Sequence, residues 1–68
     1  MRMVPLRSSN LAAAGHEGDV LEIEFTDGGL YRYFGVPGSI FRGLIAAPSA
    51  GRYFHSRIKE RYRFQRLR

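Results

Sequence analysis

The chain has 68 residues, of which eleven are Lys or Arg and six are Asp or Glu, and it contains no cysteine. This length suffices for one domain and not for two, so we expect residues 1–68 to form a single domain. The lack of cysteine excludes disulfides and thiolate metal sites, which stabilise many small proteins. The fold must therefore depend on a dense core, for which five Phe and four Tyr supply large apolar surfaces, or on self-association.

Sequence features of membrane insertion, secretion and catalysis are missing. No apolar run approaches the roughly 18 residues of a membrane span, and the small-apolar stretch at residues 11–14 is too short for a signal-peptide core. The chain has no Gly-x-Ser-x-Gly elbow, His-x-x-x-His pair or P-loop, and His16 and His55 are far apart in sequence. We therefore expect a cytoplasmic, non-catalytic protein without a metal, cofactor or membrane partner.

Three segments of the first half have features of β-strands. Residues 10–15 are a weak candidate because alanine has little strand preference. In residues 20–25, apolar and acidic side chains alternate, which is typical of a strand with one solvated face. Residues 30–34 form the third candidate. Turn-forming residues at 17–19 and 26–29, the latter with an Asp-Gly pair, separate the three segments and predict two hairpins.

The third strand can present either face to the core. Leu30 and Phe34 are the more apolar pair, and their burial would leave Tyr31 and Tyr33 facing outward. However, Arg32 shares the face of Leu30 and Phe34, and a buried Arg is unfavourable. The sequence leaves both orientations open.

Two helices are predicted after the strands. The first follows Pro37, carries Phe41, Leu44 and Ile45 at helical spacing, and ends before Pro48. The second begins at a capping residue, Ser49. Its apolar stripe consists of Phe54, Ile58 and Tyr62.

The predicted fold is therefore α+β with the order β-β-β-α-α. A three-stranded antiparallel meander is covered on one face by two C-terminal helices, because two layers close one core. Residues 63–68 either form a short C-terminal edge strand or a basic tail.

Positive charge is concentrated in the second half of the chain. Residues 1–34 contain three basic and five acidic side chains, whereas residues 35–68 contain eight basic side chains and only one acidic one, Glu60. This asymmetry is typical of a surface that faces phosphate groups or an acidic partner. The alternative is a basic surface that is merely solvated, because ten of the eleven basic residues are Arg, a bias that a GC-rich genome also produces.

Candidate nucleic-acid-binding residues follow from this charge and from the third strand. Two aromatic side chains on one sheet face can stack successive bases. Arg side chains bind phosphate in good geometry without reading sequence. The candidates are Tyr31, Arg32, Tyr33, Arg52, Arg57, Lys59, Arg61 and Arg63.

The chain also resembles a known family. The resemblance covers about residues 5–62 and rests on the order and spacing of short motifs: Ser8-Ser9-Asn10-Leu11, Tyr31-Arg32-Tyr33, Val36-Pro37, residues 44–47, and Ser49-Ala50-Gly51-Arg52-Tyr53-Phe54 followed by Ile58 and Tyr62. Together these motifs are similar to the KTSC domain. That family is named for a module at the C-terminus of some lysyl-tRNA synthetases, and it also occurs as free-standing bacterial and phage proteins.

The resemblance implies a small non-catalytic module whose suggested role is RNA binding. The family pattern has Lys at the position of Ala50 and Asn at the position of His55, so a ligand that contacts these positions would be bound differently here. We expect RNA, such as tRNA, to bind a basic C-terminal helix with aromatic support. The alternative is a protein-interaction or self-assembly module, including a homodimer, because the core is small and a sheet edge is expected to be open.

Overall fold

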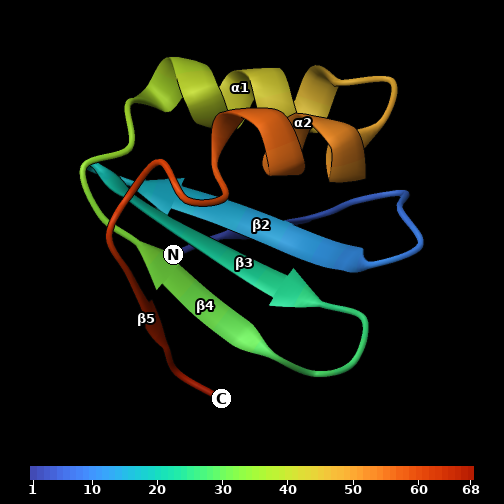
Figure 1. Ribbon diagram of the computed structural model, residues 1–68, viewed down its shortest axis with the longest axis horizontal. Helices are drawn as coiled ribbons and strands as arrows, with labels where there is room; N and C mark the ends of the chain where they lie inside the picture. Colours follow the sequence, from blue (N-terminus) through green and yellow to red (C-terminus); the bar gives the residue numbers. More distant parts are fainter.

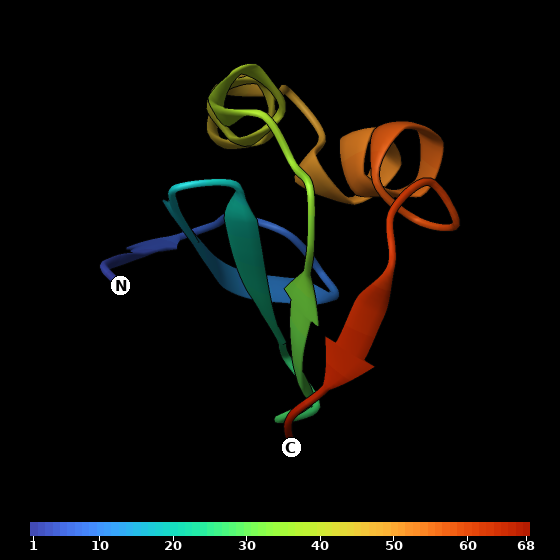
Figure 2. The ribbon, with the colours of Figure 1, turned by 90° about the vertical axis from the view of Figure 1, so that its left-hand side faces the viewer.

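A five-stranded antiparallel sheet lies under two helices in the computed structural model, which describes residues 1–68 (Figure 1). The elements in chain order are β1 (Met3–Pro5), β2 (Leu11–Glu17), β3 (Val20–Phe25), β4 (Leu30–Tyr33), α1 (Gly38–Ala46), α2 (Ala50–Arg57) and β5 (Phe64–Arg66). The strands lie side by side in this same order. Figure 2 shows both helices on one side of the sheet. The predicted α+β class is confirmed, but the prediction of three strands is wrong because the sheet has five.

The strand that the sequence did not reveal is β1, at one edge of the sheet. It pairs with β2, and Val4 lies opposite Ala14. A run of three residues that includes Pro5 gives almost no strand signal. Proline is tolerated here because an edge strand needs no hydrogen bond from its outer side.

At the other edge, β5 pairs with β4. The register places Phe64 opposite Tyr33 and Arg66 opposite Tyr31. The pairing extends beyond the strand itself. The amide of Phe34 donates a backbone hydrogen bond to Arg63 O at 2.9 Å. Of the two alternatives for residues 63–68, the edge strand is therefore correct.

Both predicted hairpin turns are present. Gly18 and Gly28 have φ angles of 63° and 95°, which an L-residue with a side chain rarely adopts. In the second turn, Asp27 Oδ1 accepts a hydrogen bond from the amide of Gly29 at 2.9 Å. These turns fix the register of β3 against both of its neighbours.

The core lies between the sheet and the helices. The alternation predicted for β3 is confirmed: Leu21 and Ile23 are fully buried, and Glu22 and Glu24, which alternate with them, point to the other face. The buried hydrophobic residues are Leu11, Ala14, Leu21, Ile23, Tyr33, Val36, Leu44, Ala50, Phe54 and Ile58. Ile45, which we placed in the apolar stripe of the first helix, is instead 42% exposed, because α1 centres its buried face on Leu44.

The second helix is shorter than its apolar stripe predicts. Ser49 caps it as expected, and its Oγ accepts a hydrogen bond from the amide of Arg52 at 3.3 Å. The helix ends at Arg57, and Ile58 has φ near −122°. Ile58 stays in the core, but Glu60 adopts a left-handed conformation with φ of 62°, so the chain leaves the helix and turns toward β5.

The orientation of β4 is settled in favour of inward tyrosines. Tyr33 is only 5% exposed, and Tyr31 is half-buried against the core. An outward-facing tyrosine pair is therefore wrong. Arg32 points to the solvent side of the sheet, where its guanidinium donates to Glu22 Oε2 at 2.6 and 2.9 Å. This ion pair with Glu22 of the neighbouring strand makes the outward orientation of Arg32 favourable.

The two helices approach each other closely at Gly43. A Cβ atom built on this residue would overlap the hydroxyl and ring of Tyr53 in α2. Glycine is otherwise unfavourable inside a helix by about 1 kcal/mol relative to alanine. We infer that the contact between the helices requires glycine at this position.

We predict that Gly43→Ala lowers the free energy of unfolding by about 1–3 kcal/mol, because the added methyl group overpacks the contact with Tyr53. For a domain of this size, each kcal/mol corresponds to a fall in Tm of about 4–8 °C. Thermal and urea unfolding followed by circular dichroism measure the change. In a Tyr53→Ala background the same substitution should be neutral or stabilising. A loss of equal size in both backgrounds would contradict the proposed contact.

Candidate nucleic-acid interface

Five aromatic side chains meet near the β5 edge of the sheet, on its helix-covered side. They are Phe25 from β3, Tyr31 and Tyr33 from β4, Phe54 from α2 and Phe64 from β5, and we call them the aromatic cluster. Strand alternation places the two tyrosines on one face, and the pairing of β4 with β5 adds Phe64 beside them. Neighbouring ring centroids are 5.3–5.9 Å apart, the spacing of packed aromatic pairs.

The aromatic cluster passes from the core to the surface. Tyr33 and Phe54 are buried, Tyr31 is half-buried, and Phe64 is 57% exposed. Burial raises the pKa of the Tyr33 phenol to about 12, because the phenolate would lose its hydration, and the neighbouring Tyr31 phenol adds to the shift. One end of the cluster therefore stabilises the fold while the other presents a ring to solvent.

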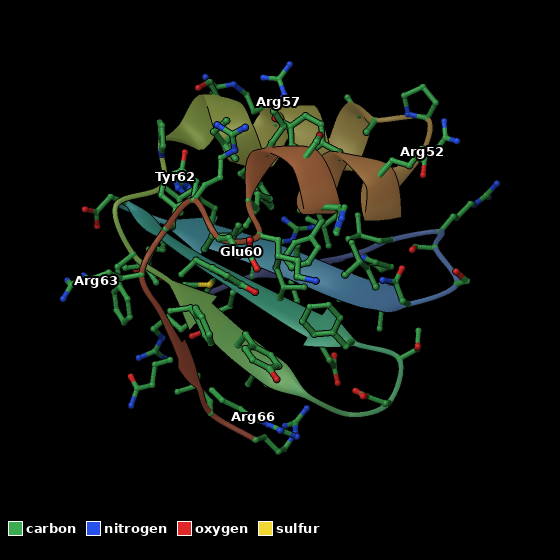
Figure 3. The ribbon with its side chains drawn as sticks, in the orientation of Figure 1. Arg52, Arg57, Glu60, Tyr62, Arg63 and Arg66 are labelled. Carbon is green, nitrogen blue, oxygen red and sulfur yellow. The ribbon has the colours of Figure 1, made fainter.

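A hollow of about 460 Å³ opens over the aromatic cluster. Besides the five rings, its lining comprises Asn10, Asp27, Gly29, Lys59, Glu60 and Arg66. We call it the aromatic hollow. The guanidinium carbon of Arg66 lies 5.6 Å from the centroid of the Tyr31 ring, a cation–π contact at its border. Figure 3 shows Arg66 and Glu60 approaching this region from β5 and from the turn after α2.

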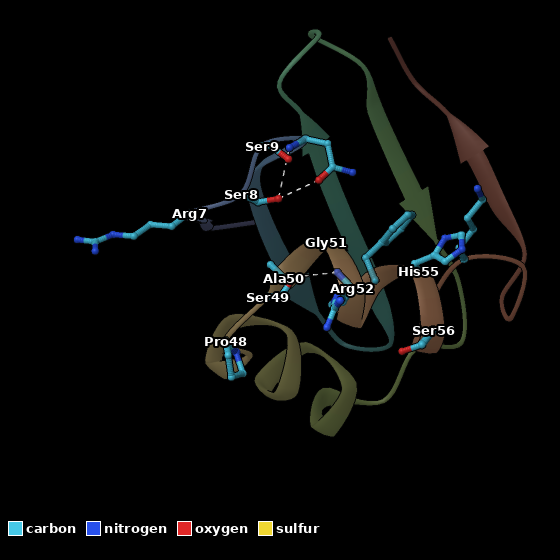
Figure 4. Close-up of a pocket in the computed structure, with 13 residues that line it drawn as sticks. Arg7, Ser8, Ser9, Pro48, Ser49, Ala50, Gly51, Arg52, His55 and Ser56 are labelled. Atoms are coloured by element: carbon cyan, nitrogen blue, oxygen red, sulfur yellow. Dashed lines mark hydrogen bonds between the residues drawn. The ribbon is translucent and has the colours of Figure 1, made fainter.

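A second hollow, of about 940 Å³, lies between the loop before β2 and the start of α2 (Figure 4). We call it the polar hollow. Its ionisable lining residues are Arg7, Arg52, His55 and Lys59, and no acidic side chain lines it. Asn10, Phe54 and Lys59 line both hollows, so the two adjoin.

The wall of the polar hollow brings together two motifs that are 40 residues apart in sequence. In the loop before β2, Ser8 Oγ donates to Asn10 Oδ1 at 2.9 Å and accepts from the amide of Leu11 at 3.3 Å. On the other side, Gly51 lies so close that a Cβ atom there would be 3.0 Å from Asn10 Oδ1. Glycine thus lets the first turn of α2 pack against this loop.

Charge is unevenly distributed between the two sides of the sheet. On the solvent side, Arg32 pairs with Glu22, and Arg68 lies 3.0 Å from Glu24. These are the only two of the eleven Lys and Arg side chains within 4.0 Å of a carboxylate. The cations around the two hollows are therefore free of ion pairs.

The structure brings together only some of the residues predicted from sequence. Tyr31, Tyr33 and Lys59 line the aromatic hollow, and Arg52 lines the polar hollow. The others lie elsewhere: Arg32 on the opposite face of the sheet, Arg57 over the Tyr53 ring, Arg63 over the Phe34 ring, and Arg61 beside Arg63 in a third, shallow hollow. The basic stretch is also not one helix, because Lys59, Arg61 and Arg63 follow the end of α2.

Several lining residues were not predicted. Phe64 and Arg66 could have been found from their alternation, which matches that of Tyr31 and Tyr33 once β5 is paired with β4. Arg7 carries no such signal, because only the packing of the loop against α2 brings it to the polar hollow, where Asn10 of the first family motif and His55 also lie.

The fold and surface define a small α+β domain with two open hollows on its helix-covered side. Neither helix is long and apolar enough to cross a membrane. No group of three His, Asp or Glu side chains is placed to hold a metal ion.

The chain belongs to the KTSC family: the model of the KTSC domain matches residues 7–62. The crystal structure of a KTSC domain protein from Yersinia pestis superposes with a TM-score of 0.93 at 32% identity, covering 98% of this chain and 97% of that one. The resemblance predicted from the motifs is therefore confirmed.

Relatives include both small and large proteins. An uncharacterised protein of Stutzerimonas stutzeri is 41% identical, and the alignment covers 98% of this chain and 99% of the relative. A lysine–tRNA ligase of Nostoc sp. is 43% identical over 47 residues, which are 69% of this chain but 8% of the ligase. The KTSC family match and the Yersinia pestis structure name no catalytic family.

We predict that the ionisation of Tyr33 lowers the free energy of unfolding at alkaline pH. Between pH 10 and about 12 the unfolded chain releases the phenolic proton while the folded chain keeps it. The contribution of this group is therefore complete below pH 10 and is lost as pH rises through about 12. It amounts to about 3 kcal/mol, from a rise of the pKa from 10 to about 12 at roughly 1.4 kcal/mol per unit.

Urea unfolding from pH 9 to 12, with Tyr33→Phe as the matched control, measures this loss. Phenylalanine keeps the ring and removes the proton, so the two curves should diverge only above pH 10. Parallel curves would show that the environment of Tyr33 does not favour the neutral phenol.

Proposed function

We propose that this protein is a small RNA-binding module whose binding surface is the pair of adjoining hollows on the helix-covered side. The observation that carries the proposal is the meeting of unpaired cations with a partly exposed aromatic cluster. Single-stranded nucleic acids bind proteins through this combination, because cations contact phosphates while aromatic rings stack on bases. The surface is open and shallow, and it contains no constellation that would act on a substrate.

The surroundings of the two hollows support a nucleic acid over a neutral ligand. Arg7, Arg52 and Lys59 line the polar hollow, and Arg66 borders the aromatic hollow. Ion pairs neutralise Arg32 and Arg68 on the solvent side of the sheet, whereas no carboxylate lies within 4.0 Å of the cations that line the hollows, so these cations contribute a positive field there. Such a field attracts a polyanion and orients it toward one face.

Relatives favour RNA over other polyanions. Lysine–tRNA ligases from Nostoc sp., Nostoc punctiforme and Trichormus variabilis each contain a stretch 43–45% identical to this chain. A module attached to a tRNA ligase would be close to tRNA. We therefore propose RNA as the class of ligand, with tRNA as one candidate.

The second candidate function is protein interaction through the open edge of β5. Phe64 is exposed there, and an unpaired strand edge can accept another strand. Against self-association, Arg63, Arg66 and Arg68 flank this edge, so that two copies meeting edge to edge would bring like charges together. RNA binding is therefore the function that the surface supports better.

We predict that the protein is monomeric up to concentrations of about 100 µM at physiological salt, because repulsion between these arginines opposes edge pairing. Size-exclusion chromatography with light scattering gives the mass directly. A dimer that strengthens with salt and is broken by Phe64→Lys would favour the assembly function instead.

The main test is fluorescence anisotropy with a labelled single-stranded RNA, a tRNA and a duplex DNA at several salt concentrations. We expect RNA binding that weakens with salt, with a log–log slope of about 0.7 for each phosphate contact on a single strand. The triple variant Arg52→Ala, Lys59→Ala, Arg66→Ala should lower the slope by about 2 and the affinity at low salt by at least about tenfold.

Arg32→Ala is the matched control, because it removes one positive charge from the opposite face of the sheet. We expect it to change the affinity by less than about twofold, because exposed charges more than a Debye length from the RNA are screened. If the two variants lose equal affinity for each charge removed, the RNA does not bind at the two hollows. If no RNA binds at low salt, the proposed function is wrong.

A further inference from the structure

The two adjoining hollows differ in chemistry in the way that the two parts of a nucleotide differ. The aromatic hollow has exposed ring surface and two carboxylates, Asp27 and Glu60, at its border. The polar hollow has three basic side chains, His55 and no carboxylate. Asn10, Phe54 and Lys59 form the boundary between them. A base would suit the first hollow and its phosphate the second.

The geometry of the aromatic cluster limits how a base can bind. Tyr31 and Phe64 are 5.9 Å apart, and Tyr33 and Phe64 are 5.8 Å apart, which are distances of rings already in contact. No base can therefore insert between two rings of the cluster. The guanidinium of Arg66 already lies over the Tyr31 ring, so a base can stack only on the exposed Phe64 ring.

Glu60 places a carboxylate in the left-handed turn after α2, where glycine is the usual residue. Its φ of 62° is uncommon for a residue other than glycine. Its carboxylate has neither an ion-pair partner nor a hydrogen bond within the chain. A carboxylate at this place repels phosphate, but it accepts hydrogen bonds from amino groups.

The free carboxylate of Glu60 distinguishes among bases. Adenine, cytosine and guanine each carry an exocyclic amino group that donates hydrogen bonds, whereas uracil presents carbonyl acceptors in the equivalent positions. An acceptor-only side chain accepts from the amino groups of the first three, whereas the one donor on this edge of uracil, N3–H, lies between two carbonyl oxygens that repel the carboxylate. Asp27 is less available for this role, because it already accepts from the amide of Gly29.

We infer that the protein binds one unstacked nucleotide of an RNA strand across the two hollows. This inference rests on the proposed RNA-binding function. The base stacks on Phe64, its amino group donates to the carboxylate of Glu60, and the adjacent phosphate contacts Lys59 and Arg52. The module thereby prefers an unpaired base with an amino group over uracil.

The test uses four labelled nine-residue RNAs of uridine that differ only at the central position, which is adenosine, cytidine, uridine or an abasic site. Anisotropy at one low salt concentration gives the four affinities for the full chain. We expect the adenosine and cytidine strands to bind about tenfold more tightly than all-uridine RNA, the size of a hydrogen bond to a charged group. The abasic strand should be the weakest ligand.

Two variants identify the groups responsible. Glu60→Gln should reduce the preference for adenosine and cytidine to less than about twofold and tighten all-uridine RNA, because a negative charge is removed. Phe64→Ala should weaken the adenosine and cytidine strands about fivefold or more and leave the abasic strand unchanged. Phe64 is 57% exposed, so this substitution does not remove a core residue.

The outcomes separate the inference from the proposed function. If all four strands bind equally with a strong salt dependence, or if Glu60→Gln tightens all of them by the same factor, the single-base site is wrong while RNA binding stands. If Phe64→Ala weakens the abasic strand as much as the others, the ring does not contact a base. If none of the strands binds, both the inference and the RNA-binding function are overturned.

Discussion

The candidate binding surface depends on one constraint, which is that the chain must reverse between α2 and β5 while Ile58 remains in the core. The amide of Ile58 donates to the carbonyl of Phe54 at 2.9 Å, and its side chain is fully buried. The reversal then requires a left-handed residue, and this residue is Glu60 rather than glycine. That conformation is unfavourable for an L-residue by about 1–2 kcal/mol. Only after this turn can β5 pair with β4 and place Phe64 and Arg66 beside the tyrosines.

The aromatic cluster serves stability and surface chemistry at the same time, and its two ends differ in which role they take. A chain of this size buries only about 60% of the surface that its unfolded form exposes. With no cysteine to form a disulfide, the large buried areas of Tyr33 and Phe54 are therefore essential to the core. Phe64 is in contact with Tyr33, so the core fixes its orientation although the ring is exposed. A ring held in this way loses little conformational freedom on binding a base.

Much of the fold followed from local sequence signals, and most of the binding surface did not. Strand β3, both hairpin turns and the start of α2 are marked by patterns among residues close together in sequence. All of these elements were predicted. The strand with Pro5 was missed because it gives almost no local signal. The end of α2 was missed because Ile58 and Tyr62 keep helical spacing after the chain has left the helix. The orientation of β4 depended on Arg32 meeting Glu22 of another strand. For the same reason the sequence identified the right kinds of side chain for the surface but not which of them lie together.

Charge distribution decides how so small a surface could retain RNA. In the lysine–tRNA ligase of Nostoc sp. the similar stretch is 8% of the chain. A domain tethered to a larger RNA-binding protein gains affinity through effective concentration, so its own contacts can be few. A free-standing chain has no such support, and its affinity must come from its own electrostatic field and stacking. Pairing Arg32 and Arg68 with the glutamates of β3 neutralises the far face. The cations that line the two hollows have no such ion pairs, so under the proposed function the attraction of phosphates and the stacking of a base on the exposed ring would act on the same strand.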